Sequence, residues 1–136
     1  RDVAPSRGLG DVYKEDPKWE KGHYKGGIGE YDRLEQARKI NREAADASAS
    51  WGMFQIMGFN YAACGEESIE SFVRSMCESE FKQLLLTANF IKKNSQMLQA
   101  LQARDWAVFA KCYNGPAYAQ NRYDVKLEAA YQKYSL

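Results

Sequence analysis

Residues 48–60 combine an apolar run with a single amide side chain. Gln55 stands inside the stretch 51–57, whose other members are tryptophan, glycine, methionine, phenylalanine and isoleucine. A buried amide without a hydrogen-bond partner costs about 1 to 3 kcal/mol, so Gln55 is expected to have one. The partner is either backbone or structural water, or a hydroxyl or acetamido group of a ligand. Both alternatives stay open, and the second is the chemistry of a sugar-binding cleft.

A second polar group stands in residues 111–118, Lys-Cys-Tyr-Asn-Gly-Pro-Ala-Tyr. Tyr113 offers an apolar ring with one hydroxyl, and Asn114 offers an amide at the end of an apolar helix. Such a pair can stack on a sugar ring and hydrogen-bond its substituents. The alternative is a helix C-cap with asparagine or glycine in the left-handed conformation and a tyrosine that fills the core.

Hydrolysis of a glycosidic bond needs a carboxylic acid that protonates the leaving oxygen. Of the 18 acidic residues, Glu30 is the best placed, because it follows a Gly-Gly-Ile-Gly run, enters a helix and stands beside Tyr31. The alternative for Glu30 is a first-turn glutamate favoured by the helix dipole. Asp46 is a second candidate, although a cap or an exposed position explains it equally well.

The elements that must position these groups are mostly helical. Residues 1–29 are rich in glycine, proline and charge, and predict a loop with a short hairpin around residues 19–28. One helix is expected over residues 30 to 45 or 47. Residues 51–57 are predicted as a buried helical segment that begins after Ser50 and ends at Gly58.

Helical spacing of apolar residues continues to the end of the chain. The expected inward faces are Ile69, Phe72, Val73 and Met76; Phe81, Leu84, Leu85, Ala88 and Ile91; Met97, Leu98 and Leu101; Trp106, Phe109, Ala110 and Tyr113; and Tyr123, Leu127, Ala130, Tyr131 and Tyr134. Asp105 is the expected N-cap of the fourth of these helices, which ends at Asn114-Gly115-Pro116. The last helix is expected from residue 117 or 121 to residue 133. The predicted fold class is mostly α, with a short glycine-rich loop or β-hairpin near the N-terminus.

Composition limits the possible functions. The 136 residues suit one domain. A net charge of +1 argues against nucleic acid as a partner, and no apolar run approaches the roughly 20 residues of a membrane span. Three cysteines without CxxC spacing and one histidine, His23, predict no metal site and no cofactor. We expect the thiols to be buried and the protein to be made in a reducing cytosol.

Several motifs carry a family resemblance. Residues 50–57 resemble the Gly-Leu-Met-Gln type motif of goose-type lysozymes and lytic transglycosylases, and Cys112-Tyr113-Asn114-Gly115 resembles their Ala-Tyr-Asn motif. Together with residues 23–37, 105–110 and 113–119, these motifs look like the N-acetylmuramidase domain of phage endolysins. The likeness covers residues 22 to 134 and implies a lysozyme-like helical fold.

The resemblance also implies an activity, cleavage of peptidoglycan between N-acetylmuramic acid and N-acetylglucosamine. It implies that Gln55, Tyr113 and Asn114 bind substrate and orient it or the attacking water, and we add Tyr31 to the substrate-binding residues. The family's general acid is a glutamate in a Glu-Ser-Gly-like motif, expected some tens of residues before the Gly-Gly segment. Only 21 residues precede Gly22, and none predicts such a helix, which leaves Glu30 as the catalytic candidate. The later Glu-Ser pairs, at residues 67, 70 and 78, are expected to be solvated.

The leading hypothesis is therefore a peptidoglycan-degrading muramidase, one domain over residues 1–136 that lacks the N-terminal catalytic helix. The alternatives are a non-catalytic module that binds peptidoglycan or a partner protein, and a purely structural helical domain. We expect a monomer that is made in the cytoplasm and acts on glycan strands of the bacterial cell wall in the periplasm, without nucleic-acid or membrane partners. Whether the product is a hydrolysed or an anhydro sugar stays open.

Overall fold

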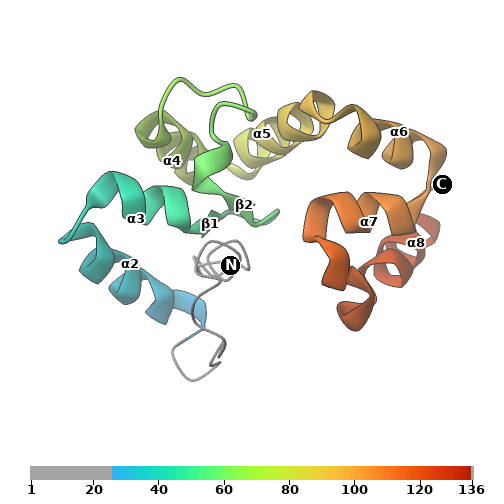
Figure 1. Cartoon of the computed structure of the whole chain (residues 1–136), viewed down its shortest axis with the longest axis horizontal. Coiled ribbons are helices and arrows are strands. Elements are labelled where there is room, and N and C mark those ends of the chain that lie inside the picture. The colour runs from blue at the N-terminus through green and yellow to red at the C-terminus, as the bar shows by residue number, and fades with distance from the viewer. Residues whose placement is uncertain (1–25, 136) are drawn as a thin grey trace. The chain divides into compact units, whose positions relative to one another are not determined.

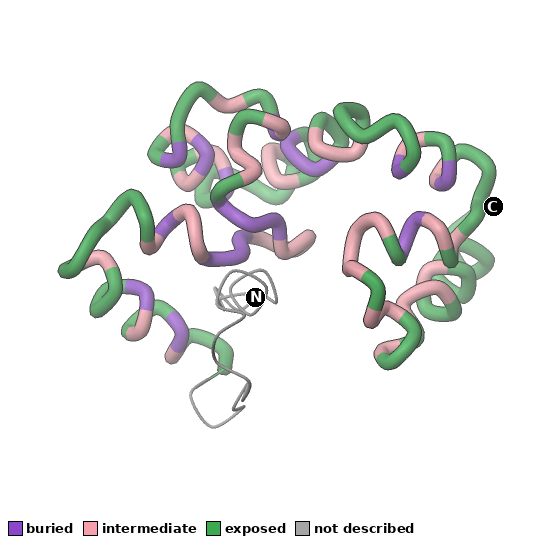
Figure 2. Tube along the Cα trace, in the orientation of Figure 1, coloured by how far each residue is buried: buried purple, intermediate pink, exposed green. Residues whose placement is uncertain are grey.

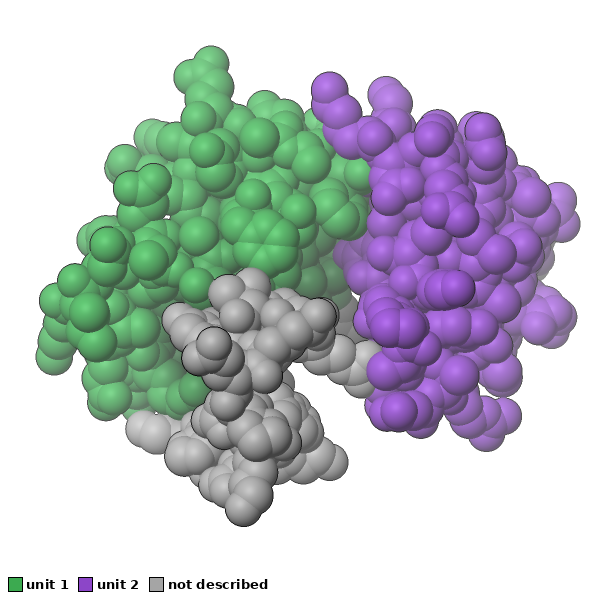
Figure 3. Space-filling view, in the orientation of Figure 1, with its two compact units in different colours: residues 1–90 green, residues 91–136 purple. Residues whose placement is uncertain are grey.

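The computed structural model describes residues 26–135, and these residues are mostly helical (Figure 1). The chain divides into two compact units, Arg1–Phe90 and Ile91–Leu136, which we describe separately (Figure 3). No helix among the described residues is long and apolar enough to cross a membrane. The predicted fold class, mostly α, is confirmed. The hairpin predicted around residues 19–28 lies outside the described residues except for its end, where a 3-10 turn covers Gly27–Gly29.

The first unit contains four α-helices among its described residues, one of which continues past the division, and a two-stranded hairpin. The elements are η2 (Gly27–Gly29), α2 (Glu30–Arg38), α3 (Arg42–Ser48), β1 (Ser50–Trp51), β2 (Ile56–Met57), η3 (Gly58–Asn60), α4 (Ile69–Glu78) and α5 (Glu80–Lys93). The described part of the second unit contains α6 (Ser95–Ala103), α7 (Trp106–Asn114), η4 (Pro116–Asn121) and α8 (Tyr123–Tyr134).

The segment 51–57, predicted as a buried helix, is instead an antiparallel hairpin. Ser50 pairs with Met57 and Trp51 pairs with Ile56, so four residues form the connecting loop. Two of these loop residues, Gly52 and Gln55, have φ values of 72° and 54°. A right-handed helix requires negative φ at every position, so these residues turn the chain back instead. The prediction was wrong because a short apolar run looks the same in a buried helix and a buried strand.

The single helix predicted from residue 30 to residue 45 or 47 is two helices, α2 and α3. The break lies at Asn41, whose backbone is extended and whose side chain accepts a hydrogen bond from the Ala44 N–H at 2.9 Å. Asparagine is among the best N-cap residues because its side chain satisfies an N–H that has no partner within the helix. The cap therefore begins a new helix where the apolar spacing alone predicts continuation.

Buried residues of α2, the hairpin, α4 and α5, coloured purple in Figure 2, belong to the core of the first unit. Its buried members are Leu34, Ala49, Trp51, Ile56, Cys64, Ile69, Phe72, Met76 and Leu86. Burial, with a smaller contribution from the charge of Glu66, raises the pKa of the Cys64 thiol to about 12. Cys64 is thus the small buried hydrophobe that we expected, whereas Cys77 is exposed and Cys112 is partly buried.

Helix α5 turns a different face inward from the one predicted. Phe81, Leu84 and Leu85 are 67%, 51% and 43% exposed, and the buried side chains are Leu86 and Thr87. The sequence of α5 carries two stripes at helical spacing, and only one is purely apolar. The inward stripe is the mixed one, because Thr87 satisfies its hydroxyl by donating to the Gln83 carbonyl oxygen at 2.8 Å.

In the second unit, α7 packs against both α6 and α8. Asp105 caps α7 as predicted, since its side chain accepts from the Val108 N–H at 3.1 Å. The predicted buried edge of α8 is wrong, because no residue of α8 is buried and Tyr134 is 74% exposed. Instead, Tyr131 lies with its ring 5.3 Å from that of Trp106 and 5.1 Å from the Arg104 guanidinium.

Candidate functional site

The hairpin loop, residues 52–55, holds the amide that the sequence singles out. Gln55 Oε1 accepts a hydrogen bond from Ser50 Oγ at 3.0 Å, and its Nε2 donates to the Gly52 carbonyl oxygen at 2.9 Å. Ser50 is fully buried, so this contact ties the loop to the interior. The amide therefore has protein partners, the first of the two alternatives. A ligand contact of Gln55 stays a prediction.

The loop is also held from outside the hairpin, by a residue that the sequence did not single out. The Met53 N–H donates to Gln83 Oε1 at 2.9 Å, and Gln83 Nε2 donates to the Met76 carbonyl oxygen at 2.8 Å. Gln83 and Thr87 are the polar members of the inward stripe of α5. Gln83, Leu86, Thr87 and Phe90 are spaced as one face of a helix, and a glutamine on such a face is the sequence signal that could have identified this residue.

A buried ion pair between Arg38 of α2 and Asp46 of α3 lies next to Trp51 in the first strand of the hairpin. Arg38 Nε lies 2.6 Å from Asp46 Oδ1, and Arg38 Nη1 lies 2.6 Å from Glu35 Oε1. Burial acts to lower the pKa of Arg38, but the bonds to Asp46 and Glu35 outweigh it and raise that pKa above its ordinary value. The Arg38 guanidinium also lies 5.8 Å from the centre of the Trp51 ring.

Trp51 is held by a hydrogen bond from its indole and by the packing of its ring in the core. Its indole N–H donates to the Asp46 carbonyl oxygen at 2.9 Å, and its ring belongs to the core, which Phe54 contacts from the loop. Asp46, the second carboxylate candidate, is only 4% exposed and is engaged by Arg38, which fits a structural role.

Glu30, the candidate acid, is fully buried at the first position of α2. Its Oε1 accepts from the Gly26 N–H at 2.9 Å, and its Oε2 lies 2.5 Å from Arg33 Nη1. Both carboxylate oxygens thus have partners within the protein at the start of α2. Tyr31, the next residue, is 45% exposed and presents its side chain on the surface of the same helix.

Tyr113 and Asn114 belong to the second unit, at the end of α7. The Tyr113 ring stacks on that of Phe109, with centroids 5.7 Å apart and an angle of 22° between the planes. Asn114 is the last residue of α7, and the residue with positive φ is Gly115, whose N–H donates to the Lys111 carbonyl oxygen at 2.9 Å. The second alternative is present only in part, because Gly115 ends the helix with φ 84° and ψ 179°, outside the left-handed helical region, and Tyr113 is only partly buried. A sugar contact of the pair stays a prediction.

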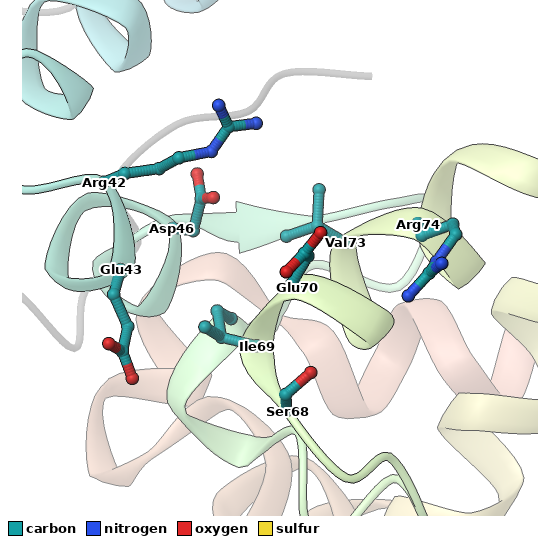
Figure 4. A pocket seen from close by; sticks show the side chains of 8 residues that line it. All are labelled: Arg42, Glu43, Asp46, Ser68, Ile69, Glu70, Val73 and Arg74. Carbon is teal, nitrogen blue, oxygen red and sulfur yellow. The ribbon is translucent and has the colours of Figure 1, made fainter.

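A separate cavity of about 550 Å³ opens at the starts of α3 and α4 (Figure 4). It is lined by Arg42, Glu43, Asp46, Ser68, Ile69, Glu70, Val73 and Arg74. None of the predicted substrate-binding residues lines it. The Glu-Ser pairs are solvated as predicted, since Glu67, Glu70 and Glu78 are exposed. Across residues 26–135, no cluster of three potential metal ligands is present.

Comparisons with known proteins show the family to which this chain belongs. It matches the family model of N-acetylmuramidase over residues 9–135. It is similar to the crystal structure of the Burkholderia AP3 phage endolysin, with 44% identity and a TM-score of 0.78 over 94% of this chain. The alignment covers 49% of that endolysin, so this chain spans about half of its length. No curated protein sequence matches the chain. Because the family model covers almost the whole sequence, this chain belongs to the N-acetylmuramidase family.

Proposed function

We propose that this chain is the muramidase domain of a phage endolysin and cleaves peptidoglycan between N-acetylmuramic acid and N-acetylglucosamine. The observation that carries the proposal is the family match over residues 9–135, which includes Gln55, Tyr113 and Asn114. The similarity to a phage endolysin supports the cell wall as the place of action. Within this proposal the protein is a monomer that is made in the cytoplasm and meets glycan strands in the periplasm.

The proposed substrate-binding residues are Gln55 and Tyr31 in the first unit and Tyr113 and Asn114 in the second. Gln55 supports this role through its place in a loop whose backbone is fixed by two side-chain amides, its own and that of Gln83. Tyr31 supports it through an exposed ring, since an aromatic ring can stack on the apolar face of a sugar. None of these side chains needs to transfer a proton.

A Gln55→Ala substitution tests the proposal. It removes the amide and is expected to lower the release of reducing ends from purified peptidoglycan by about 10-fold or more. Gln132→Ala is the matched control, because Gln132 is an exposed glutamine of α8 whose amide, among residues 26–135, bonds to Glu128 at 3.4 Å. The control is expected to keep wild-type activity.

Release of reducing ends by neither this 136-residue chain nor the full gene product would overturn the enzymatic proposal. In that case, sedimentation of the wild type with insoluble peptidoglycan would identify the non-catalytic binding module. If the wild type cleaves and Gln55→Ala cleaves equally well, Gln55 is not a substrate-binding residue.

We propose that Glu30 stabilises the start of α2 and is not the general acid. The proton for the leaving oxygen then comes from a carboxyl group outside residues 26–135. The Glu30 carboxylate is buried and is bonded to Arg33 and to the Gly26 N–H, so it holds the start of α2 in place. Glu30→Gln removes the charge at nearly constant shape. It is expected to lower the free energy of unfolding by about 2 kcal/mol while kcat of the folded protein stays within about threefold of wild type.

The measurement pairs urea denaturation with the initial rate of reducing-end release below the unfolding transition. Glu35→Gln is the control, because it changes a carboxylate of the same helix whose side chain is 61% exposed. A folded Glu30→Gln protein with kcat at least about 1000-fold below wild type would instead make Glu30 the general acid.

A further inference from the structure

We propose that Gln83 is the positioning residue of the substrate-binding loop, residues 52–55, and that its loss weakens glycan binding by more than its contribution to stability explains. This inference rests on the proposed function of that loop. Gln83 belongs to α5, 30 residues away from Met53 in the chain, so it acts on the loop through tertiary structure.

The carboxamide of Gln83 uses both of its ends on backbone groups. Its oxygen accepts from the Met53 N–H in the loop, and its nitrogen donates to the Met76 carbonyl oxygen in α4, at 2.9 and 2.8 Å. One side chain thus joins the hairpin loop to two helices. An apolar side chain of the same shape would leave both backbone groups without this partner.

The loop approaches Gln83 as closely as glycine allows. A Cβ atom added at Gly52 would lie 2.9 Å from Gln83 Oε1 and 3.0 Å from Met76 Sδ. The φ of Gly52, 72°, also disfavours any side chain there. The sequence therefore carries glycine where the loop contacts the Gln83 side chain, and a larger residue there would push the loop away from Gln83.

Further hydrogen bonds lie on both sides of the contact between Gln83 and Met53. The Thr87 hydroxyl donates to the Gln83 carbonyl oxygen at 2.8 Å, and both Leu86 and Thr87 are buried. On the other side, Gln55 Nε2 donates to the carbonyl oxygen of Gly52, the residue before Met53. Gln83 therefore fixes the backbone that carries Gln55, and a fixed loop loses less conformational freedom when it binds a ligand.

The test compares Gln83→Met with Asn89→Leu, which are near-isosteric replacements of two amides on the same helix. Asn89 Nδ2 donates to the Cys64 carbonyl oxygen at 3.1 Å and makes no contact with the loop that the structure records. Each variant is assayed for stability in urea, for hydrogen exchange of the Met53 amide, for Kd of the N-acetylglucosamine tetramer and for KM and kcat on peptidoglycan.

Both variants are expected to lose similar stability, but only Gln83→Met is expected to speed Met53 exchange and to raise Kd and KM, by about 10-fold. Asn89→Leu is expected to stay within about twofold of wild-type Kd. Equal Kd changes in the two variants would overturn the proposed positioning role. A wild type that neither binds the tetramer nor cleaves peptidoglycan would remove the proposed function, and this inference with it.

Gln83→Glu gives a second variant with a pH readout. Its carboxyl oxygen can still accept from the Met53 N–H, but only the protonated carboxyl can also donate to the Met76 carbonyl oxygen. Affinity relative to wild type at the same pH is therefore expected to recover as the pH falls. Absence of this recovery, in a variant that remains folded, would contradict the proposal that the hydrogen bonds at both ends of the Gln83 carboxamide are needed.

Discussion

Gly58→Ala is expected to destabilise the first unit by about 3 kcal/mol or more, near the upper end of the range for overpacking substitutions. A Cβ atom at this position would lie 2.1 Å from the Asp46 carbonyl oxygen, 2.8 Å from Ile69 Cδ1 and 2.9 Å from Ala47 Cα. Two of these three atoms are backbone atoms of α3, so η3 and α3 would have to separate. Urea denaturation followed by circular dichroism measures the loss.

Gly115→Ala is the control for Gly58→Ala. Gly115 has a φ of 84°, but an added Cβ there would meet no atom within 4 Å. Its substitution is expected to cost about 1 to 3 kcal/mol of backbone strain, because a φ of 84° with a ψ of 179° is a conformation that is essentially restricted to glycine. A Gly58→Ala protein as stable as Gly115→Ala would show that η3 can move away from α3 at little cost.

Arg38→Met is expected to cost about 3 kcal/mol or more, because it leaves the Asp46 carboxylate buried without its cation. The side chains of Arg38 and Asp46 are only 15% and 6% exposed, so water cannot fully replace the lost contact. The variant also loses the contact of Arg38 with the Trp51 ring. The free energy of unfolding in urea measures the change.

Arg42→Met serves as the matched control, since Arg42 is an exposed arginine at the start of α3 and its loss is expected to cost no more than about 0.5 kcal/mol. Adding Asp46→Asn to Arg38→Met should recover part of the stability, because it removes the uncompensated charge. A double variant that is less stable than Arg38→Met alone would contradict this origin of the effect.

The spacing of apolar residues was sufficient to predict the helices that contain their own start and stop signals. Helix α7 lies where its pattern predicts, because Asp105 caps it and Gly115 and Pro116 end it. The break at Asn41 carried a local signal too, but the apolar spacing continues across it. Where helix-forming residues and a good cap occur together, tertiary contacts decide between them.

The remaining differences depend on contacts between segments that are distant in the chain. The sequence of α5 contains one apolar stripe and one mixed stripe, and the mixed stripe faces inward because Gln83 and Thr87 find partners there. For the site, the need of Gln55 for a partner was predictable, but its partners Ser50 and Gly52 required the hairpin. Gln83 required the packing of α5 against that hairpin.

The placement of Trp51 and Trp106 gives each unit an optical probe of its own. Trp51 lies in the core of the first unit under a guanidinium group, and Trp106 stands on α7 of the second unit beside Tyr131. In a Trp19→Phe background, which removes the third tryptophan, Trp51→Phe and Trp106→Phe leave one indole each. Their fluorescence would then report separately on how each unit melts and how each responds to glycan.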